Sequence, residues 1–168
     1  MANLSAQSID DLDKKNGFNQ FQFGDHISQW DSYVKLTEFK FTDPNTKVYH
    51  YTGNCCQKLF WYDIAGIFLT FHKDELVVIE IVFEKGKSRQ YCDERLVEIM
   101  KNLVALYGEP HSVETPETGS PTPCLMWMGQ KVILIVTHTR NYDSSCVTDI
   151  EIYNMKYFEK QYNLTTDF

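Results

Sequence analysis

Two β-rich runs near the middle of the chain, residues 64–71 (IAGIFLTF) and 75–83 (ELVVIEIVF), are separated by only His72, Lys73 and Asp74. Branched and aromatic side chains favour extended backbone, and so short a connection joins strands that run antiparallel. The sequence therefore predicts a β-hairpin at the centre of the fold. Both runs are almost continuously apolar, so another element has to cover this hairpin.

Further strands are expected on both sides of the hairpin, because short β-rich or alternating segments recur between turn residues. They are residues 18–24, 33–41 and 48–51 before it, and residues 124–128, 131–140 and 146–153 after it. Short connections between them imply antiparallel pairing. We therefore expect one mainly antiparallel sheet.

The best helical pattern runs from about residue 89 to 107, where apolar residues recur at helical spacing. Gly108 followed by Pro110 ends it. Residues 5–15 predict a short N-terminal helix, and residues 155–164 a last helical turn or two. A principal helix packed on one face of an antiparallel sheet defines the α+β class.

The segment 109–123 holds four of the five prolines and no aromatic residue, so we predict an exposed loop. Neither side of this loop alone has enough sheet to cover the helix. The loop is therefore expected to connect parts of one domain, and 168 residues is the size of one ordinary domain. We predict a single α+β domain over residues 1–168.

The composition narrows the classes of partner. The formal net charge is −7 and no cluster of Lys and Arg offsets it, so nucleic acid is not expected as a partner. No run reaches the ~18 apolar residues of a membrane span. The N-terminus has neither a basic start nor an apolar core, which predicts a cytoplasmic protein. An exported form remains the alternative, because residues 4–8 (LSAQS) resemble the end of a cleaved signal peptide.

The cysteines give little evidence of chemistry. Their count of five is odd and their spacing irregular, which fits a reducing compartment better than a disulfide framework. Cys55 and Cys56 are adjacent, so on a strand they point to opposite faces, whereas zinc sites use ligands that converge. A thiol or metal site formed by them with His50 is a third hypothesis. No P-loop, G-x-G-x-x-G, G-x-S-x-G or H-E-x-x-H occurs, and we predict no metal, no cofactor and no catalytic residue.

The last predicted hairpin brings ionisable residues together. If residues 131–140 pair with 147–154 across the loop 141–146, His138 lies opposite Asp149 on one face. The same register sets Arg140 opposite Val147, Val136 opposite Glu151 and Leu134 opposite Tyr153. Glu80 interrupts the second run of the central hairpin and joins this face if the sheet leaves it open. Ile133, Ile135, Ile150 and Ile152 are then expected under the helix.

Aromatic residues make up 14% of the chain, and Phe60, Trp61 and Tyr62 are consecutive. Successive strand residues alternate faces, so at least one of these rings is expected to be exposed; Trp61 and Tyr62 are the candidates for an exposed patch. The predicted binding residues are Trp61, Tyr62, Glu80, His138, Arg140, Asp149, Glu151 and Tyr153.

We therefore predict a non-enzymatic interaction protein, for which an inhibitor or immunity-type protein is one form. It would bind another protein, or a second copy of itself, through an exposed sheet face or aromatic edge. The alternative is a small-ligand-binding protein or an enzyme, with a pocket near His138, Asp149 and Glu151. A histidine beside a carboxylate is the arrangement that general base catalysis uses.

Overall fold

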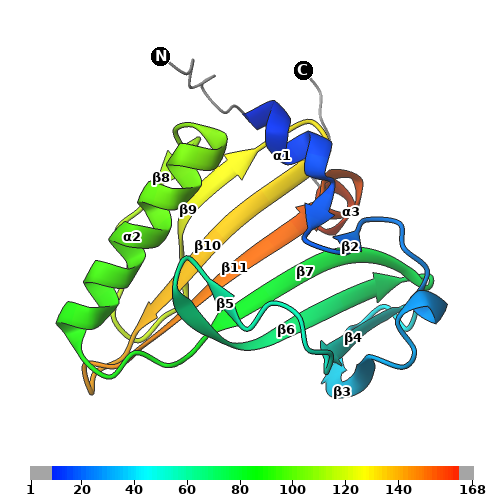
Figure 1. Cartoon of the computed structure of the whole chain (residues 1–168), viewed down its shortest axis with the longest axis horizontal. Helices are drawn as coiled ribbons and strands as arrows, with labels where there is room; N and C mark the ends of the chain where they lie inside the picture. Colours follow the sequence, from blue (N-terminus) through cyan, green and yellow to red (C-terminus); the bar gives the residue numbers. More distant parts are fainter. Residues whose placement is uncertain (1–8, 163–168) are drawn as a thin grey trace.

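The computed structural model describes residues 9–162, which form one long antiparallel sheet with helices packed on it and a separate two-stranded sheet (Figure 1). In chain order the elements are α1 (Ile9–Lys15), β1 (Gly17–Phe18), β2 (Phe21–Gln22), the 3₁₀ turn η1 (Ile27–Gln29), β3 (Val34–Lys40), β4 (Thr46–Tyr51), β5 (Lys58–Leu59), β6 (Tyr62–His72), β7 (Glu75–Phe83), α2 (Arg89–Tyr107), β8 (Ser112–Val113), β9 (Thr122–Met128), β10 (Val132–Arg140), β11 (Cys146–Asn154) and α3 (Met155–Gln161).

The sheet has the strand order β3-β4-β6-β7-β11-β10-β9-β8, with β5 paired to β6 beside this path. Every pairing is antiparallel. Two meanders, one from each half of the chain, meet where β7 pairs with β11. The connection from β7 to the far edge strand β8 contains α2. A single sheet therefore runs through both halves, as the prediction of one α+β domain requires.

The central hairpin is confirmed as β6 and β7. Its turn residues Lys73 and Asp74 have φ angles of 52° and 66°, and a two-residue turn with positive φ at both positions matches the twist of the flanking strands. His72 pairs with Glu75 across the turn. The strongest local pattern in the sequence thus forms the centre of the sheet.

The predicted principal helix is confirmed as α2. The side chain of Ser88 accepts a hydrogen bond from the Tyr91 N–H, which caps the first turn. Gly108, with φ 80°, closes the last turn by donating its N–H to the Val104 carbonyl. On its sheet side, α2 buries residues such as Ile99 and Leu103. Figure 1 shows α2 lying across the sheet, where it covers the main core.

The opposite face carries a smaller core under α3. Ile133 and Ile135 pack there against Phe158, whereas Ile150 and Ile152 belong to the core beneath α2. The prediction that all four isoleucines lie under the principal helix is therefore wrong for the two on β10.

The predicted register of β10 and β11 is wrong by one residue. Arg140 pairs with Cys146 and His138 with Thr148, so the loop spans five residues, 141–145. The Asn141 N–H donates to the Ser145 carbonyl at 2.9 Å, and Ser144 adopts a φ of 66°. A shift of one residue exchanges the two faces of a strand. His138 and Asp149 consequently lie on opposite faces of the sheet.

The ends and the long loop differ from expectation in detail. Residues 5–8 of the predicted first helix lie outside the described residues, as do residues 163–164 of the last one. Residues 109–123 are mostly exposed as predicted, but they include β8, which pairs with β9 at the sheet edge. Within residues 9–162, no helix combines the length and apolar character needed to cross a bilayer.

Candidate functional site

A groove of about 520 Å³ runs over the sheet face that α2 does not cover. Strands β3, β4, β6, β7 and β11 supply its floor and one wall, and α3 with the residue after it supplies the other wall. We call it the acidic groove, because Glu80 and Glu151 are the only Asp, Glu, Lys, Arg or His residues among the described residues that line it. Its lining residues are Thr37, Phe39, Phe41, Val48, Phe68, Thr70, Val78, Glu80, Glu151, Tyr153, Tyr157, Gln161 and Tyr162.

Two glutamates face each other across neighbouring strands on the floor of the acidic groove. Glu80 on β7 is paired directly with Glu151 on β11. Directly paired cross-strand residues have their Cβ atoms about 4.5–5.5 Å apart, and like charges at that distance destabilise a sheet. Asp149 lies two residues before Glu151 on the same face. Three carboxyl groups therefore share one part of the face, as the sequence predicted for Glu80, Asp149 and Glu151.

The protonation of these carboxyl groups is shifted accordingly. Burial, followed by the nearby charges of Glu151 and Asp149, raises the pKa of Glu80 to about 7. Burial and the charge of Glu151 raise the pKa of Asp149 to about 6. The buried Oδ1 atom of Asp149 has no hydrogen-bond partner among the described residues. Burial and mutual repulsion therefore make these carboxyl groups harder to ionise than isolated ones.

Tyr153 adds a polar contact on this floor. Its hydroxyl donates a hydrogen bond to the carboxylate of Glu151. Burial and the charge of Glu151 both raise the pKa of Tyr153, which keeps the phenol protonated as a donor. Tyr153 therefore orients one carboxylate and leaves the facing Glu80 free of such a contact.

Aromatic rings form much of the walls. Phe39 and Phe41 on the β3 side meet edge to face with their centroids 5.0 Å apart, although Phe39 is 61% exposed. Tyr157 and Tyr162 face them from α3 and its C-terminal end. Rings whose faces carry partial negative charge attract cations. Walls and floor therefore favour the same sign of ligand charge.

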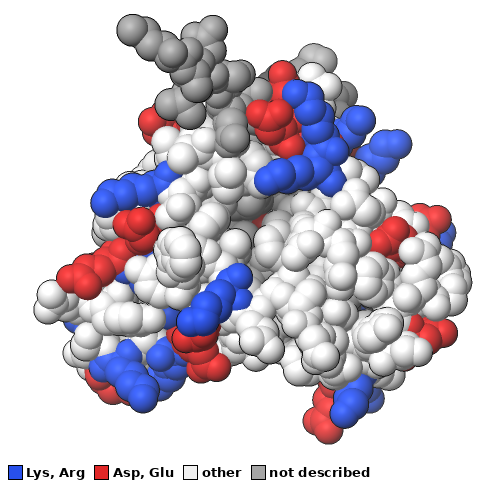
Figure 2. All heavy atoms as spheres, in the orientation of Figure 1, with Lys and Arg blue, Asp and Glu red and all other residues white. Residues whose placement is uncertain are grey.

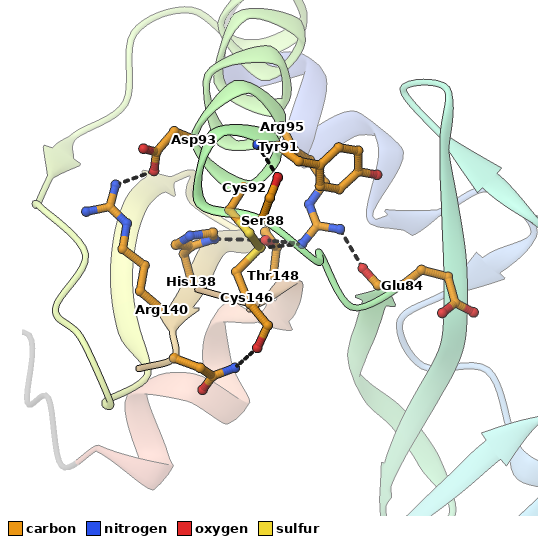
Figure 3. Close-up of a disulfide and its surroundings, with 12 residues drawn as sticks. Glu84, Ser88, Tyr91, Cys92, Asp93, Arg95, His138, Arg140, Cys146 and Thr148 are labelled. Carbon is orange, nitrogen blue, oxygen red and sulfur yellow. Dashed lines mark hydrogen bonds and ion pairs between the residues drawn. A yellow bond between two sulfur atoms is a disulfide. The ribbon is translucent and has the colours of Figure 1, made fainter. Parts of the chain in front are cut away.

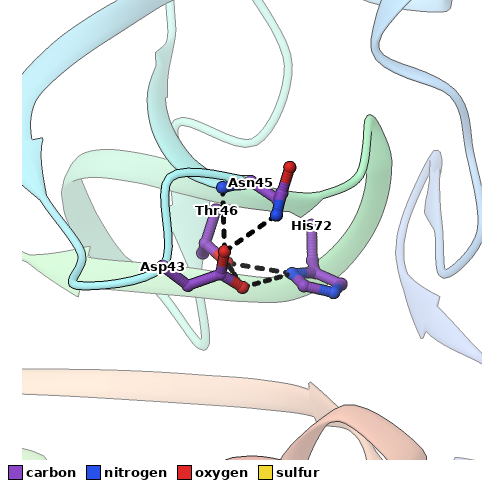
Figure 4. Close-up of polar contacts among 4 residues, drawn as sticks. All are labelled: Asp43, Asn45, Thr46 and His72. Carbon is purple, nitrogen blue, oxygen red and sulfur yellow. Dashed lines mark hydrogen bonds and ion pairs between the residues drawn. The ribbon is translucent and has the colours of Figure 1, made fainter.

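A polar cluster fixes the turn that follows Phe41 (Figure 4). The Asp43 carboxylate accepts the Asn45 N–H at 2.9 Å and lies 3.3 Å from His72 Nδ1. The Thr46 hydroxyl lies 3.0 Å from the same nitrogen. The His72 ring in turn packs against the ring of Tyr157, 5.6 Å between centroids. This cluster ties the β3–β4 turn to α3, so it holds the two walls at a fixed separation.

Sequence reasoning missed most of these wall residues. Phe39 and Phe41 alternate with Glu38 and Lys40, so their shared face could be inferred, but nothing local links that face to Glu80 three strands away. Tyr157 and Tyr162 reach the acidic groove only because α3 folds back over β11.

His138 and Arg140 lie on the other face, beneath α2 (Figure 3). His138 is 0% exposed, and its Nδ1 is 2.8 Å from the Thr148 hydroxyl. Burial, with the charges of Arg140 and Arg95, lowers the pKa of His138 to about 4. Arg140 donates to Asp93 at 2.6 Å. His138 is thus a neutral core histidine, and the predicted pairing with Asp149 does not occur.

Arg95 is the centre of this buried cluster. It is 1% exposed, and its guanidinium donates to the Glu84 carbonyl and, at 3.0 Å, to the Thr148 hydroxyl. Its guanidinium also lies 5.4 Å from the centroid of the Tyr91 ring. Carbonyl, hydroxyl and ring contacts of this kind stabilise a buried cation, although the buried Nε of Arg95 has no hydrogen-bond partner among the described residues. The cluster therefore joins α2 to β11 and has a structural role.

Cys92 and Cys146 form a disulfide beside this cluster, with their Cα atoms 6.0 Å apart (Figure 3). The interpretation of all five cysteines as reduced is therefore wrong for these two. The bond joins the first turn of α2 to the first residue of β11, which are 54 residues apart in sequence. Spacing along the chain could not reveal it, because the register of β11 decides where Cys146 points.

The predicted aromatic patch separates into two different environments. Trp61 is 88% exposed, as expected of at least one ring in the trio. Tyr62 is half-buried, and its ring packs against Phe83 and Tyr91 on the α2 side of the sheet. The two residues therefore do not form one exposed patch, and neither lines the acidic groove.

The thiol and metal hypothesis receives no support from geometry. Cys56 accepts a hydrogen bond from the Asn19 side chain at 3.0 Å, and Cys55 one from Gln20 at 3.4 Å. Burial and the neighbouring Cys55 raise the pKa of Cys56 to about 12, opposite to a reactive thiolate. His50 instead stacks on Phe68. Within the described part of the chain, no three His, Cys, Asp or Glu side chains are placed to hold a metal ion.

Fold and groove together define an α+β protein with one antiparallel sheet, covered by α2 on one face and holding an acidic, aromatic groove on the other. The comparisons with known proteins match no family model, no curated protein and no solved structure. Function is therefore to be inferred from the geometry and charge of the acidic groove.

Proposed function

We propose that this protein is a non-enzymatic binding protein whose acidic groove receives a lysine or arginine side chain of another protein. The observation that carries the proposal is the facing pair Glu80 and Glu151 on the floor of a groove with aromatic walls. A basic side chain there would neutralise the pair and lie against the rings. This is the interaction protein that the sequence predicted, with the sheet face rather than the Trp61 edge as its binding surface.

The charge state of the floor supports a cationic ligand. Without one, Glu80 is disfavoured as a carboxylate, which is why its pKa is raised to about 7. A bound ammonium or guanidinium group favours the ionised form and so displaces the proton. Affinity for a cation should consequently rise with pH up to about pH 7 and then level off.

The experiment is a selection of displayed twelve-residue peptides on the purified protein at pH 7.5. We expect the enriched peptides to share a lysine or arginine flanked by apolar residues. Replacement of that basic residue by glutamine should weaken binding at least ten-fold, since truncating a partly buried charge pair costs about 2–5 kcal/mol. The double variant Glu80→Gln, Glu151→Gln should lose the same peptides.

Glu117→Gln is the matched control, because Glu117 lies in the exposed loop and is not among the residues that line the acidic groove. It should bind the selected peptides like the unchanged protein. Enriched peptides without a basic residue, or full binding by the double variant, would contradict the proposal. An affinity that is independent of pH between 5 and 7 would contradict the role of Glu80.

A small amine ligand is the second candidate for the same groove. The observation in its favour is the volume of about 520 Å³, which falls in the range of small-molecule sites. Titration with free butylamine and tetramethylammonium separates the two candidates. Saturable binding of a free amine as tight as that of the best peptide favours a small ligand. The enzyme alternative loses its proposed base, because His138 lies across the sheet from Asp149 and Glu151.

The disulfide is relevant to the cellular compartment in which this protein resides. Structural disulfides form and persist in oxidising compartments, so the buried bond between Cys92 and Cys146 supports the exported alternative over the cytoplasmic one. Counting free thiols in protein isolated under alkylating conditions tests this. Three free thiols are expected, from Cys55, Cys56 and Cys124.

A further inference from the structure

A second groove, of about 640 Å³, lies on the α2 side of the sheet. It is bounded by α1, the β1–β2 hairpin, the β5–β6 turn and the last two turns of α2. Figure 2 shows the hollow beside α2, with Lys and Arg atoms gathered over α1 at its upper edge. We call it the lysine-rimmed groove. It is lined by Lys14, Lys15, Gly17, Phe18, Asn19, Gln22, Cys56, Lys58, Leu59, Phe60, Ile81, Leu103, Leu106, Tyr107, Leu134, Ile150 and Ile152.

The interior of this groove is apolar. Side chains of β7, β10 and β11 form its floor, and each of these floor residues is at most 3% exposed. Its walls are half-buried apolar residues such as Phe18, Leu59 and Leu106. An apolar cavity of a few hundred Å³ with a few polar groups at one side is typical of small-ligand sites.

The charged side chains that line this groove are lysines. Three lysines line the groove and no aspartate or glutamate among residues 9–162 does. Lys14 and Lys58 each form an ion pair with a carboxylate outside the lining, at 3.1 and 3.0 Å. Lys15 forms no such pair in the described part of the chain. Its ammonium instead lies 3.3 Å from the Tyr107 hydroxyl and 5.3 Å from the centroid of that ring.

The β5–β6 turn provides one wall in an unusual conformation. Phe60 and Trp61 have φ angles of 50° and 71°, a region in which bulky residues are rare. Asn and Gly are the usual residues of such two-residue turns. Here the turn directs Phe60 into the lysine-rimmed groove and leaves Trp61 exposed. Strained conformations of this kind concentrate at ligand sites.

We propose that the lysine-rimmed groove binds a small anionic amphiphile, a single aliphatic chain that ends in a carboxylate. The chain would lie between Leu106 and Phe60, and the carboxylate would contact Lys15. Charge complementarity selects this class, because an apolar interior with a cationic rim accepts a fatty-acid-like anion and rejects the corresponding cation. The acidic groove on the other sheet face has the opposite preference, so the two sites are independent.

Calorimetric titration below the micelle concentration tests the proposal with dodecanoate and dodecyltrimethylammonium, which share a chain and differ in charge. We expect one dodecanoate per protein, bound at least ten-fold more tightly than the cation. Shortening the chain to decanoate should weaken binding by up to about four-fold per methylene removed. Equal affinity for both head groups, or no dependence on chain length, would overturn the proposal.

Variants locate the site. Lys15→Met keeps the aliphatic stem and removes the charge, so dodecanoate binding should weaken about five- to ten-fold, whereas the cation should bind as tightly as before or more tightly. Lys47→Met, at an exposed position of β4 that lines neither groove, should bind like the unchanged protein. Leu106→Glu should abolish binding, whereas Glu80→Gln should not alter it.

Two outcomes would refute the assignment. One is unchanged dodecanoate affinity in Lys15→Met. The other is a protein dimer in sedimentation that Leu106→Glu dissociates and that takes up no dodecanoate, since the groove would then be a self-association face.

Discussion

Glu80→Gln is expected to stabilise the protein at pH 8, although it removes a charge from the surface of a proposed binding site. The pKa of Glu80 rises from an ordinary value of 4.5 to about 7 on folding. Between these values the folded chain holds a proton that the unfolded chain has released. Stability therefore falls as the pH rises through this window, and the full loss is present above pH 7.

The size of the effect follows from the same two values. A difference between 4.5 and about 7 corresponds to at most about 3.4 kcal/mol of unfolding free energy. Glu80 is half-buried rather than enclosed, so solvent screens part of this amount, and we expect about 1–2 kcal/mol. Glutamine fills nearly the same volume without a charge, and it leaves Glu151 facing a neutral partner.

Urea unfolding of both proteins from pH 4 to pH 8 measures the effect. The difference between variant and unchanged protein should be near zero at pH 4 and reach its full value by pH 8. Taking this difference cancels contributions that both proteins share, such as that of His138. Glu117→Gln should show no pH-dependent difference. A Glu80→Gln variant that is less stable at pH 8, or equally affected at pH 4 and pH 8, refutes the destabilisation of the Glu80 carboxylate by burial and by the nearby charges of Glu151 and Asp149.

Three further predictions concern the scaffold. Replacing Cys92 and Cys146 by alanine should lower the unfolding free energy measured by guanidinium titration by about 4 kcal/mol, because the disulfide closes a loop of 54 residues. Reductant should destabilise the unchanged protein by a similar amount and leave the variant unaffected. Asp13→Ala should lower the free energy of unfolding by about 2–3 kcal/mol in thermal or urea unfolding, because the Asp13 carboxylate accepts hydrogen bonds from the N–H groups of Gln130, Lys131 and Val132 at 2.7–3.0 Å. Asp10→Ala, at an exposed position, should change it little. His138→Leu should flatten the loss of stability on acidification from pH 6.5 to 4, because the folded pKa of His138 is lowered to about 4 and the unfolded chain takes up the proton first; an unchanged slope would contradict its burial as a neutral ring.

Local patterns were enough to predict the central hairpin and α2. The two apolar runs of β6 and β7 leave room only for a tight turn, and Ser88 and Gly108 bound a segment with helical periodicity. Both elements depend on residues that are close in sequence, so the composition and spacing of those residues are enough to predict them. The α+β class follows from them directly.

The site was predicted in part, because its members depend on register and on distant elements. Glu80, Asp149, Glu151 and Tyr153 share the uncovered face as expected, since period-two alternation within each strand is reliable. The register between β10 and β11 could not be predicted in the same way. The loop between them closes after five residues with Ser144 in a left-handed conformation that its sequence does not favour. That one residue moved His138 from the proposed site into the core and Arg140 to the α2 side of the sheet.

The register also explains why the two faces of the sheet differ in chemistry. With Arg140 opposite Cys146, the helix side of β11 begins with the disulfide and continues through Thr148 to the isoleucines of the core. Its other side presents only Val147, Asp149, Glu151 and Tyr153, three of which carry a polar terminus. The isoleucine core on the helix side stabilises the fold, and the repulsion among carboxyl groups on the other face can then be tolerated. Such a locally unfavourable arrangement that the rest of the fold supports is characteristic of functional sites, and it is the physical reason to place ligand recognition on the acidic groove.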